Sequence, residues 1–498
     1  MVSLPGFYLF EITEGFYGEG PFSQELPQVQ AEIMKAVTLF WFCMALTFFA
    51  DACEKDKPQL KVKAAAESAE EKTKRNGSDD SPDIALAAGE SGSSRVQGSK
   101  RVGSRTLSQW PQFHGPSRDN ISRETLLLKQ WPPDGPTLLW TATDIGDGFA
   151  TVAVANRLIY TTGNIGDDTV ITALNLDGSL EWTAKNGPAY KRSTPGTRGT
   201  PTIDNARVYH ENADGDIVCL DAKTGKTIWS LNMLEKFHGR NITWGLAESL
   251  LVDRNNLICT PGGESVGMVA LDKNTSETVW VCKGTNDKPG YCSPIVFEYK
   301  GIRQIVTMLA RSVIGVNADN GALLWQFEHI TPYDENINVP IFHNGCIFVS
   351  TQTTGSRLLR LDVKAEKVDV EQLWHSQQLE NQHGGVLLVD GCLYGTCRYN
   401  TQAPWACLDI KTGKRLYSDP GIGRSSLTCA DGMLYALNHE RTLALVRPSP
   451  HALQIVSRFT IPSGGRGPTW AHPVVCNGRL YIRHGNFLYC YDVEGKPK

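Results

Sequence analysis

The sequence lacks both a strong net charge and a zinc-binding motif. Its 49 Lys and Arg residues nearly balance 53 Asp and Glu residues, which leaves a formal charge of −4 over 498 residues. Proteins that bind nucleic acid usually present a basic face, so the balance argues against such a partner. None of the 13 cysteines forms a Cys-x-x-Cys pair. We therefore expect no zinc site.

Long amphipathic helical patterns are scarce after residue 130. Short runs of β-branched and aromatic residues, separated by Gly, Asp and Asn, dominate there and are typical of an all-β fold. The string CLDAKTGKTIW at Cys219–Trp229 recurs as CLDIKTGKRLY at Cys407–Tyr417 and as ALDKNTSETVW at Ala270–Trp280. It lacks the upstream glycine and the following helix of a phosphate-binding loop. We interpret it as the outer hairpin of a repeated sheet.

Aromatic residues mark the period of this repeat. They close predicted strands at intervals of about 42 to 51 residues, which suits the blades of a β-propeller. Each unit contains four antiparallel strands, and a ring of such sheets buries both of their faces. We expect the six tryptophans of the series to dock between neighbouring sheets: Trp140, Trp182, Trp229, Trp280, Trp325 and Trp374. Tyr417 and Phe459 continue the series.

Counting the repeats predicts eight blades. Seven full units run from about residue 149 to 459, and an eighth begins at Thr469–Val475 but lacks its outer strand. An unpartnered strand at Thr137–Trp140 precedes the first unit. It can complete the last blade and close the ring. Seven blades is the alternative, because the unit ending near Phe459 has the weakest signature. The propeller domain is predicted to span residues 109–498.

The segment before the propeller reads as an export signal and a linker. Residues 34–53 place one Lys before a short apolar run and then small residues, the layout of a signal peptide. We therefore predict that translation starts at Met34 and that residues 1–33 are not part of the protein; a retained anchor helix is the alternative. Residues 54–108 are rich in Lys, Glu, Ala, Ser and Gly, which predicts a disordered linker.

Cys53 directly follows the small residues at the end of this predicted signal. It resembles the lipid-modified cysteine of bacterial lipoproteins, which would tether the protein to a membrane surface. Asp51 and Ala50 depart from that pattern, so plain cleavage after Ala52 stays open.

The repeated pattern Ala-x-Asp-x-x-Thr-Gly-x-x-x-Trp is similar to the tryptophan-docking motif of PQQ-like β-propeller repeats. The string WPQFHGPSRDNIS at Trp110–Ser122 also resembles the first segment of exported bacterial members of that family. The family includes quinoprotein dehydrogenases as well as BamB-like lipoproteins without catalytic activity. The resemblance therefore implies a fold and leaves the activity open.

Candidate ligand-binding residues lie at the starts of the predicted innermost strands, which line a funnel at one face of a propeller. Arginine could hold an anion through paired hydrogen bonds, and tryptophan could stack on a planar group. The alternative for each residue is a structural role, in which its side chain packs inside the protein or lies in solvent at the rim of the funnel. The nine candidates are Arg198, Trp244, Glu248, Tyr291, Asn338, His383, Arg424, Trp470 and His472.

These features favour an exported, monomeric binding or scaffold module without catalytic residues, metal or cofactor. Its partner at the propeller face would be a protein, a peptide or a glycan, and a BamB-like role in envelope protein assembly is one version. The alternative is a PQQ- and calcium-dependent alcohol or sugar dehydrogenase, in which Glu248 and Asn338 would hold calcium. A third ligand, the adjacent cysteine pair and the covering insertions of such enzymes are missing from the sequence.

Overall fold

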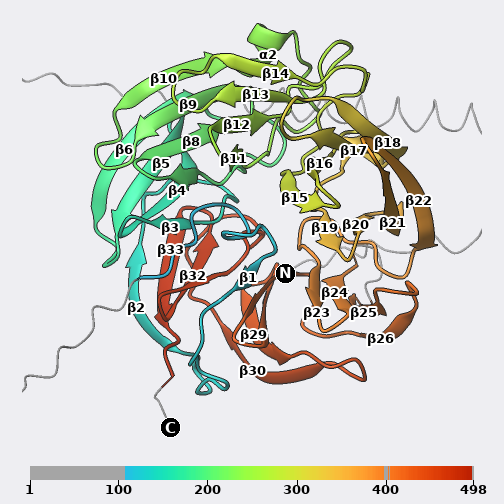
Figure 1. The fold of residues 1–498 in the computed structure, drawn as a ribbon. Helices are drawn as coiled ribbons and strands as arrows, with labels where there is room; N and C mark the ends of the chain where they lie inside the picture. Colours follow the sequence, from blue (N-terminus) through green and yellow to red (C-terminus); the bar gives the residue numbers. More distant parts are fainter. Residues whose placement is uncertain (1–106, 398–401, 403, 496–498) are drawn as a thin grey trace, which may run out of the picture. The chain divides into compact units, whose positions relative to one another are not determined.

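A computed structural model describes residues 107–397, 402 and 404–495. These residues form eight four-stranded antiparallel sheets arranged as a ring, with a short fifth strand added to one sheet (Figure 1). The predicted eight-bladed propeller is confirmed, and the seven-bladed alternative is wrong. The predicted start, signal peptide and lipid attachment, and all but the end of the predicted linker, lie outside the described residues. In the described part of the chain, no helix is long and apolar enough to cross a membrane.

The first four blades follow one another along the chain, each starting with its innermost strand. Blade 1 contains β3 (Ala153–Ala155), β4 (Leu158–Ile165), β5 (Asp168–Asn175) and β6 (Leu180–Pro188). Blade 2 contains β7 (Thr202–Asp204), β8 (Arg207–Glu211), β9 (Asp216–Asp221) and β10 (Thr227–Asn232). Blade 3 contains β11 (Leu251–Asp253), β12 (Asn256–Cys259), β13 (Val269–Asp272) and β14 (Thr278–Val281). Blade 4 contains β15 (Ile295–Tyr299), β16 (Ile302–Met308), β17 (Ser312–Asn317) and β18 (Leu323–Glu328).

The next three blades repeat this order. Blade 5 contains β19 (Ile341–His343), β20 (Cys346–Thr351), β21 (Gly355–Lys364) and β22 (Lys367–Ser376). Blade 6 contains β23 (Leu387–Val389), β24 (Cys392–Thr396), β25 (Trp405–Asp409) and β26 (Arg415–Asp419). Blade 7 contains β27 (Ser425–Ala430), β28 (Met433–Asn438), β29 (Thr442–Arg447) and β30 (Gln454–Thr460). Two short helices lie between blades, α2 (Met233–Phe237) and the 3-10 turn η1 (Pro332–Asp334).

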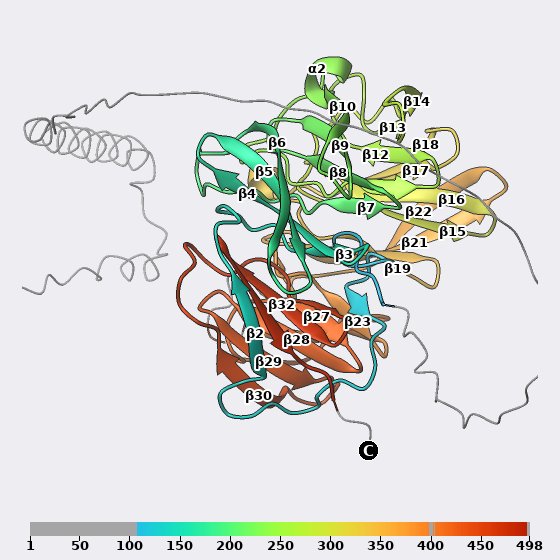
Figure 2. The same cartoon turned by 90° about the vertical axis from the view of Figure 1, so that its left-hand side faces the viewer.

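The eighth blade joins the two ends of the propeller. It contains β31 (Val474–Cys476), β32 (Arg479–His484) and β33 (Phe487–Asp492), and its outer strand is β2 (Thr137–Ala142) from the start of the domain. Strands β2 and β33 run antiparallel. Figure 2 shows β2 beside the red strands from the C-terminal end of the domain. The prediction that an N-terminal strand closes the ring is confirmed.

Each docking tryptophan packs on the next blade. Trp182 of blade 1 donates its indole N–H to the carbonyl of Ala222 in blade 2 at 3.1 Å. Its ring lies so close to Gly225 that a Cβ atom there would come within 2.6 Å of it. Four other tryptophans donate to backbone carbonyls of the following blade in the same way: Trp140, Trp229, Trp280 and Trp374. Trp325 instead donates to the side-chain oxygen of Gln304 in its own blade.

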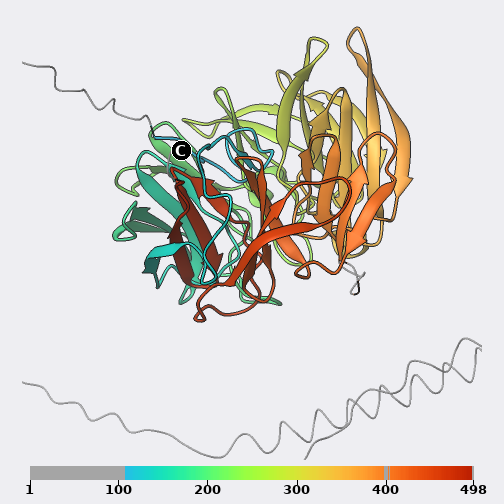
Figure 3. The same ribbon diagram turned by 90° about the horizontal axis from the view of Figure 1, so that it is seen from below.

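Apolar clusters fill the spaces between neighbouring blades. One cluster joins blades 1 and 2 through Tyr160, Trp182 and Val208, all buried. The middle strands bury both faces, as in β5, whose six central residues are all buried. The blades therefore stabilise one another side to side, and the sheets stand around a central axis (Figure 3).

A segment at Trp110–Ser122, here called the plug, crosses the centre of the ring (Figure 1). Trp110 pairs with Val154 of blade 1, and the buried guanidinium of Arg118 donates to the carbonyl of Pro294 in blade 4 at 2.9 Å and to that of Leu250. The plug ends in β1 (Ile121–Ser122), which pairs in parallel with β27 as the fifth strand of blade 7. It therefore contacts blades on several sides of the axis.

Candidate functional site

A pocket with a volume of about 460 Å³ lies where the innermost strands begin. Its walls come from the first residues of most of the blades and from the plug, so it is here called the axial pocket. Of the nine candidates from the sequence, seven line it: Arg198, Trp244, Tyr291, His383, Arg424, Trp470 and His472.

The other two candidates, Glu248 and Asn338, are buried outside the pocket lining. The side-chain amide of Asn338 donates to the carbonyls of Ser350 at 2.8 Å and Asn381 at 3.2 Å, which ties blades 5 and 6 together. Glu248 lies between two lining residues, Ala247 and Ser249, but its carboxyl is buried. Alternation along an extended segment explains this, since successive side chains point to opposite sides.

Two arginines give the axial pocket its positive charge. Arg198 is held by the carbonyls of Gly196 at 3.1 Å and Thr194 at 3.0 Å, and its guanidinium lies 4.5 Å above the ring of Tyr190. Burial lowers the pKa of Arg198 below its usual value. Arg424 is exposed. Glu335 also lines the pocket, and its carboxylate accepts from the side-chain amide of Gln382 at 3.3 Å. The two guanidinium groups can pair with an anionic ligand.

Aromatic rings form two walls of the pocket. On one side, the Trp470 ring lies 4.8 Å from Phe149 and 4.5 Å from His383, measured between centroids. On the other side, the Trp244 ring lies 6.1 Å from Tyr291. Rings in these positions offer flat apolar faces to a ligand.

Histidines gather beside Trp470. The Nε2 atoms of His383 and His439 are 3.0 Å apart. Behind them, His472 has its Nε2 atom 2.9 Å from the carbonyl oxygen of His383 and its Nδ1 atom 3.1 Å from the amide nitrogen of Asn120. Burial lowers the pKa of His472. The Nδ1 atom also lies 3.1 Å from the carbonyl oxygen of Leu427. The contacts of both ring nitrogens with backbone carbonyls hold the ring against the backbone at His383.

Ten lining residues were not among the candidates from the sequence: Phe113, Phe149, Thr194, Ala247, Ser249, Ser293, Glu335, Ile337, Gln382 and His439. His439 follows β28, the second strand of its blade, and an antiparallel second strand ends where the innermost strand begins. That rule could have found His439 from the sequence. Phe113 belongs to the plug, and no local pattern indicates that the plug reaches the axis.

A buried pair of carboxyls lies close to the pocket. Burial raises the pKa of Glu248 to about 8, and the nearby Arg118 guanidinium opposes part of that rise. Burial raises the pKa of Glu211 as well, and repulsion from Glu248 adds to the effect. Both oxygens of Glu211 lack a hydrogen-bond partner within the described chain. We infer that this pair holds at least one proton at neutral pH.

The residues present fit a calcium ion poorly. Calcium takes six to eight oxygen ligands, commonly with several carboxylates. In the described part of the chain, no three His, Cys, Asp or Glu side chains are placed to share a metal ion. The two calcium ligands suggested by the sequence, Glu248 and Asn338, do not line the axial pocket.

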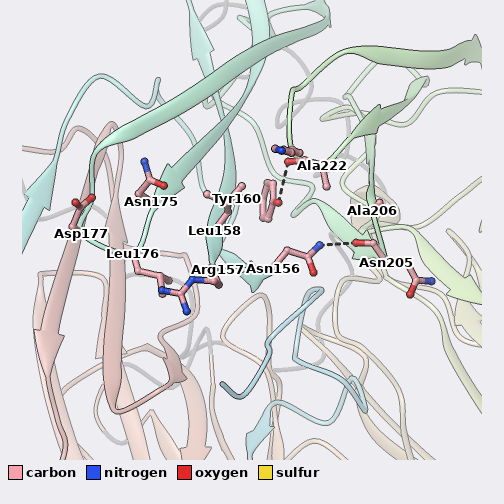
Figure 4. A pocket seen from close by; sticks show the side chains of 11 residues that line it. Asn156, Arg157, Leu158, Tyr160, Asn175, Leu176, Asp177, Asn205, Ala206 and Ala222 are labelled. Atoms are coloured by element: carbon pink, nitrogen blue, oxygen red, sulfur yellow. Dashed lines mark hydrogen bonds between the residues drawn. The ribbon is translucent and has the colours of Figure 1, made fainter. Parts of the chain in front are cut away.

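A second cavity, of about 780 Å³, lies at the opposite ends of the strands, between hairpins of blades 1 and 2. Figure 4 shows its polar lining, with Asn156 donating to the carbonyl of Asn205 at 2.5 Å. Tyr160 donates its hydroxyl to the carbonyl of Ala222 at 3.2 Å. These groups join the two blades, so we interpret the cavity as a feature of blade packing.

Comparison with known proteins places the chain in a family. The family model described as "Outer membrane protein assembly factor BamB" matches residues 166–419, just over half of the chain. No curated protein sequence matches the chain.

Solved structures share its fold at low identity. BamB from Moraxella catarrhalis has a TM-score of 0.51 at 14% identity, covering 73% of this chain and 99% of its own. A quinohemoprotein alcohol dehydrogenase from Comamonas testosteroni has a TM-score of 0.54 at 12% identity, and the match covers 78% of this chain and 81% of the dehydrogenase. A europium-containing methanol dehydrogenase has a TM-score of 0.55 at 13% identity, and the match covers 76% of this chain and 91% of the dehydrogenase. Together with the family match, the eight blades and their docking tryptophans show that this chain belongs to the PQQ-like, BamB-like β-propeller family.

Proposed function

We propose that this chain is a noncatalytic binding module of the cell envelope, and that it takes an anionic, partly aromatic segment of a protein partner into the axial pocket. Both the family and the fold are shared with an outer-membrane assembly factor, which supports a scaffold role. The fold is also shared with dehydrogenases, so the fold alone does not decide the activity.

The observation that carries the proposal is the pocket lining. Arg198 and Arg424 lie in the same pocket as Trp244 and Trp470, and Glu335 is the carboxylate in that lining. The plug borders the pocket, since Phe113 forms part of its wall and the neighbouring His114 is buried. We expect a ligand to enter from the face where the innermost strands begin. A peptide carrying acidic and aromatic side chains matches such a lining.

Peptide display on the purified protein tests this proposal. We expect enrichment of acidic and aromatic sequences, and the selected peptides should bind at least about tenfold more weakly to the R198Q/R424Q variant, since charged hydrogen bonds are worth about 1.5–3 kcal/mol each. R157Q is the matched control, because Arg157 lines the second cavity. Enrichment without acidic residues, or equal binding by R198Q/R424Q, would contradict the proposal. Loss of binding in R157Q alone would place the site in the second cavity.

The alternative function, a PQQ- and calcium-dependent dehydrogenase, is supported by the flat aromatic walls and arginines, which could hold a planar anionic cofactor. The poor fit of the lining to calcium speaks against it. Adding PQQ and calcium to the purified protein should give no stoichiometric quinone absorbance and no dye-linked alcohol oxidation. Saturable cofactor binding with turnover would overturn the noncatalytic proposal.

We also propose that the protein is exported and tethered through Cys53, because the export signal and its final cysteine precede a propeller of an envelope family. Replacement C53S should move the protein from the membrane fraction to the soluble fraction of the envelope. Plain cleavage after Ala52 would leave the fractionation of C53S unchanged.

A further inference from the structure

We propose that Tyr333 is a ligand-contacting residue that extends the aromatic wall of the axial pocket out to the rim of the propeller. The inference rests on the proposed function and deepens it, because it says where an aromatic side chain of the peptide ligand lies. Tyr333 belongs to η1, in the connection between blades 4 and 5, and lies outside the pocket lining itself.

The ring of Tyr333 continues an aromatic series that begins inside the pocket. Its centroid lies 5.6 Å from that of Trp244, and the Trp244 ring lies 6.1 Å from Tyr291. Trp244 and Tyr291 both line the axial pocket, and the backbone N–H of Trp244 donates to the hydroxyl of Tyr291 at 2.9 Å. The three rings therefore offer one apolar surface that runs from the pocket to solvent. Flat surfaces of this kind suit an aromatic side chain of a peptide.

Neither the packing nor the backbone of the folded chain calls for a tyrosine at this position. Tyr333 is 69% exposed, more than any other large hydrophobic residue in the described part of the chain. Its backbone has a φ of 61° and a ψ of 25°, a left-handed conformation that is unfavourable for a residue with a Cβ atom. A glycine would relieve that strain. Strained residues of this kind cluster at binding sites, where the strain serves function.

The base of the loop that carries Tyr333 is fixed, although its tip is exposed. Asn336 is fully buried, and its side-chain amide donates to the carbonyls of Leu309 at 2.7 Å and His329 at 2.9 Å. The buried Thr331 donates its hydroxyl to the side-chain oxygen of Asn336 at 2.7 Å. Both ends of the loop are thereby held on blade 4. A ring presented from a fixed loop costs less entropy when a ligand binds to it.

Peptide display against the full-length native protein and against its Y333G variant tests the assignment. Native protein should enrich acidic and aromatic residues, whereas Y333G should keep the acidic enrichment and lose most of the aromatic enrichment. A peptide selected on the native protein should bind Y333G about three- to tenfold more weakly, as expected for one lost aromatic contact. Y333F should bind like the native protein because it keeps the ring. L180A is the matched control, since Leu180 is 62% exposed on the outer strand of blade 1 and should leave binding unchanged.

The melting temperature of Y333G separates a ligand contact from a structural role. Because glycine removes the left-handed strain, the variant should melt at or above the temperature of the native protein while it binds the peptide more weakly. A lower melting temperature together with weaker binding would assign Tyr333 to loop stability and overturn the proposal.

The binding data also separate this inference from the proposed function. Equal aromatic enrichment on both proteins, or equal affinity of the selected peptide for them, would overturn the contact at Tyr333. When R198Q/R424Q weakens binding and Y333G does not, the proposed function stands and only the contact at the rim fails. Enrichment of no sequence by the native protein would contradict both.

Discussion

At the residue scale, the buried charged groups near the axis set how the propeller responds to pH. Glu248 and Glu211 lie in an interior where the charged form of a carboxyl is costly, and Arg118 is the nearby cation. Arg118 also holds the plug through backbone carbonyls of blades 3 and 4. Burial lowers the pKa of Arg118 to about 10, so its guanidinium still carries a charge at neutral pH.

Replacing Glu248 should flatten the dependence of stability on pH. Its pKa is raised to about 8 in the folded protein and is near 4.5 when unfolded, so its contribution is complete below about pH 4.5 and is lost as the pH rises towards 8. The loss is at most about 1.4 kcal/mol per pH unit for one carboxyl. We expect E248Q to unfold at higher urea concentration than the native protein at pH 8, with a smaller difference at pH 5.

The matched control for this urea series is E277Q, because Glu277 is exposed. It should follow the native profile at both pH values. The same pH dependence in E248Q and the native protein would show that Glu248 does not carry the effect.

At the element scale, the outer hairpin and outer strand of each blade share one construction. A residue that has no partner in the register, a β-bulge, immediately precedes the aromatic docking residue in seven blades. In blade 7 the bulge precedes Ser457, and Phe459, which the sequence places in the docking series, pairs with Leu443 two residues further on. Such bulges twist an edge strand and protect it from pairing with other chains. The unpaired residues are Leu139, Glu181, Ile228, Val279, Leu324, Leu373, Leu416 and Val456.

The hairpin of blade 3 departs from this construction and offers a stabilising change. Ser276 occupies the turn position with a φ of 63°, whereas Gly225 holds the equivalent place in blade 2 with a φ of 69°. Non-glycine residues pay about 1–2 kcal/mol in that conformation. We expect S276G to raise the free energy of unfolding by about 0.5–1 kcal/mol in urea denaturation.

The reciprocal change should destabilise the protein. A Cβ atom at Gly225 would lie 2.6 Å from the Trp182 ring, so G225A adds a steric clash to the backbone strain. We expect a loss of about 2 kcal/mol or more, measured by the same denaturation. A neutral G225A would mean that Trp182 can move away without cost.

At the scale of the whole molecule, the N-terminal strand and the plug hold the ring closed. Strand β2 completes blade 8, and Trp131, just before it, packs against Tyr435 and Phe459 of blade 7. Because Phe459 also lies against Gly135, the segment before β2 fills the space between the last two blades. These contacts explain how blade 7 is held in the ring although its repeat signature in the sequence is weak.

Removing the closing segment should open the ring. A chain beginning at residue 143 lacks the plug, Trp131 and β2, and loss of one buried tryptophan side chain alone costs about 3–5 kcal/mol. We expect this chain to bind a hydrophobic dye and to self-associate in size-exclusion chromatography through the exposed edge of β33. A chain beginning at residue 107 is the control and should stay monomeric. Identical elution of both chains would contradict the closing role.

Much of the axial pocket could be predicted from the sequence because the repeat fixes which residues start each innermost strand. Arg198, Trp244 and Trp470 were found in this way, and the structure brings them into one pocket. His439 and Glu335 were missed, since they lie in loops outside the repeated string. Glu248 was expected at the mouth, yet its carboxyl turns away from it, because side-chain direction depends on the local backbone of the connecting segment.

The sequence by itself determined the strand pattern, the eight blades and the closing strand, because alternating hydrophobicity, turn glycines and a regular aromatic spacing are local properties that recur. Only the tertiary structure decided the path of the plug, the burial of Arg118 and Glu248, and the meeting of His383 with His439. Those contacts join residues from different blades or from opposite ends of the chain, and they depend on how the closed ring places side chains around its axis.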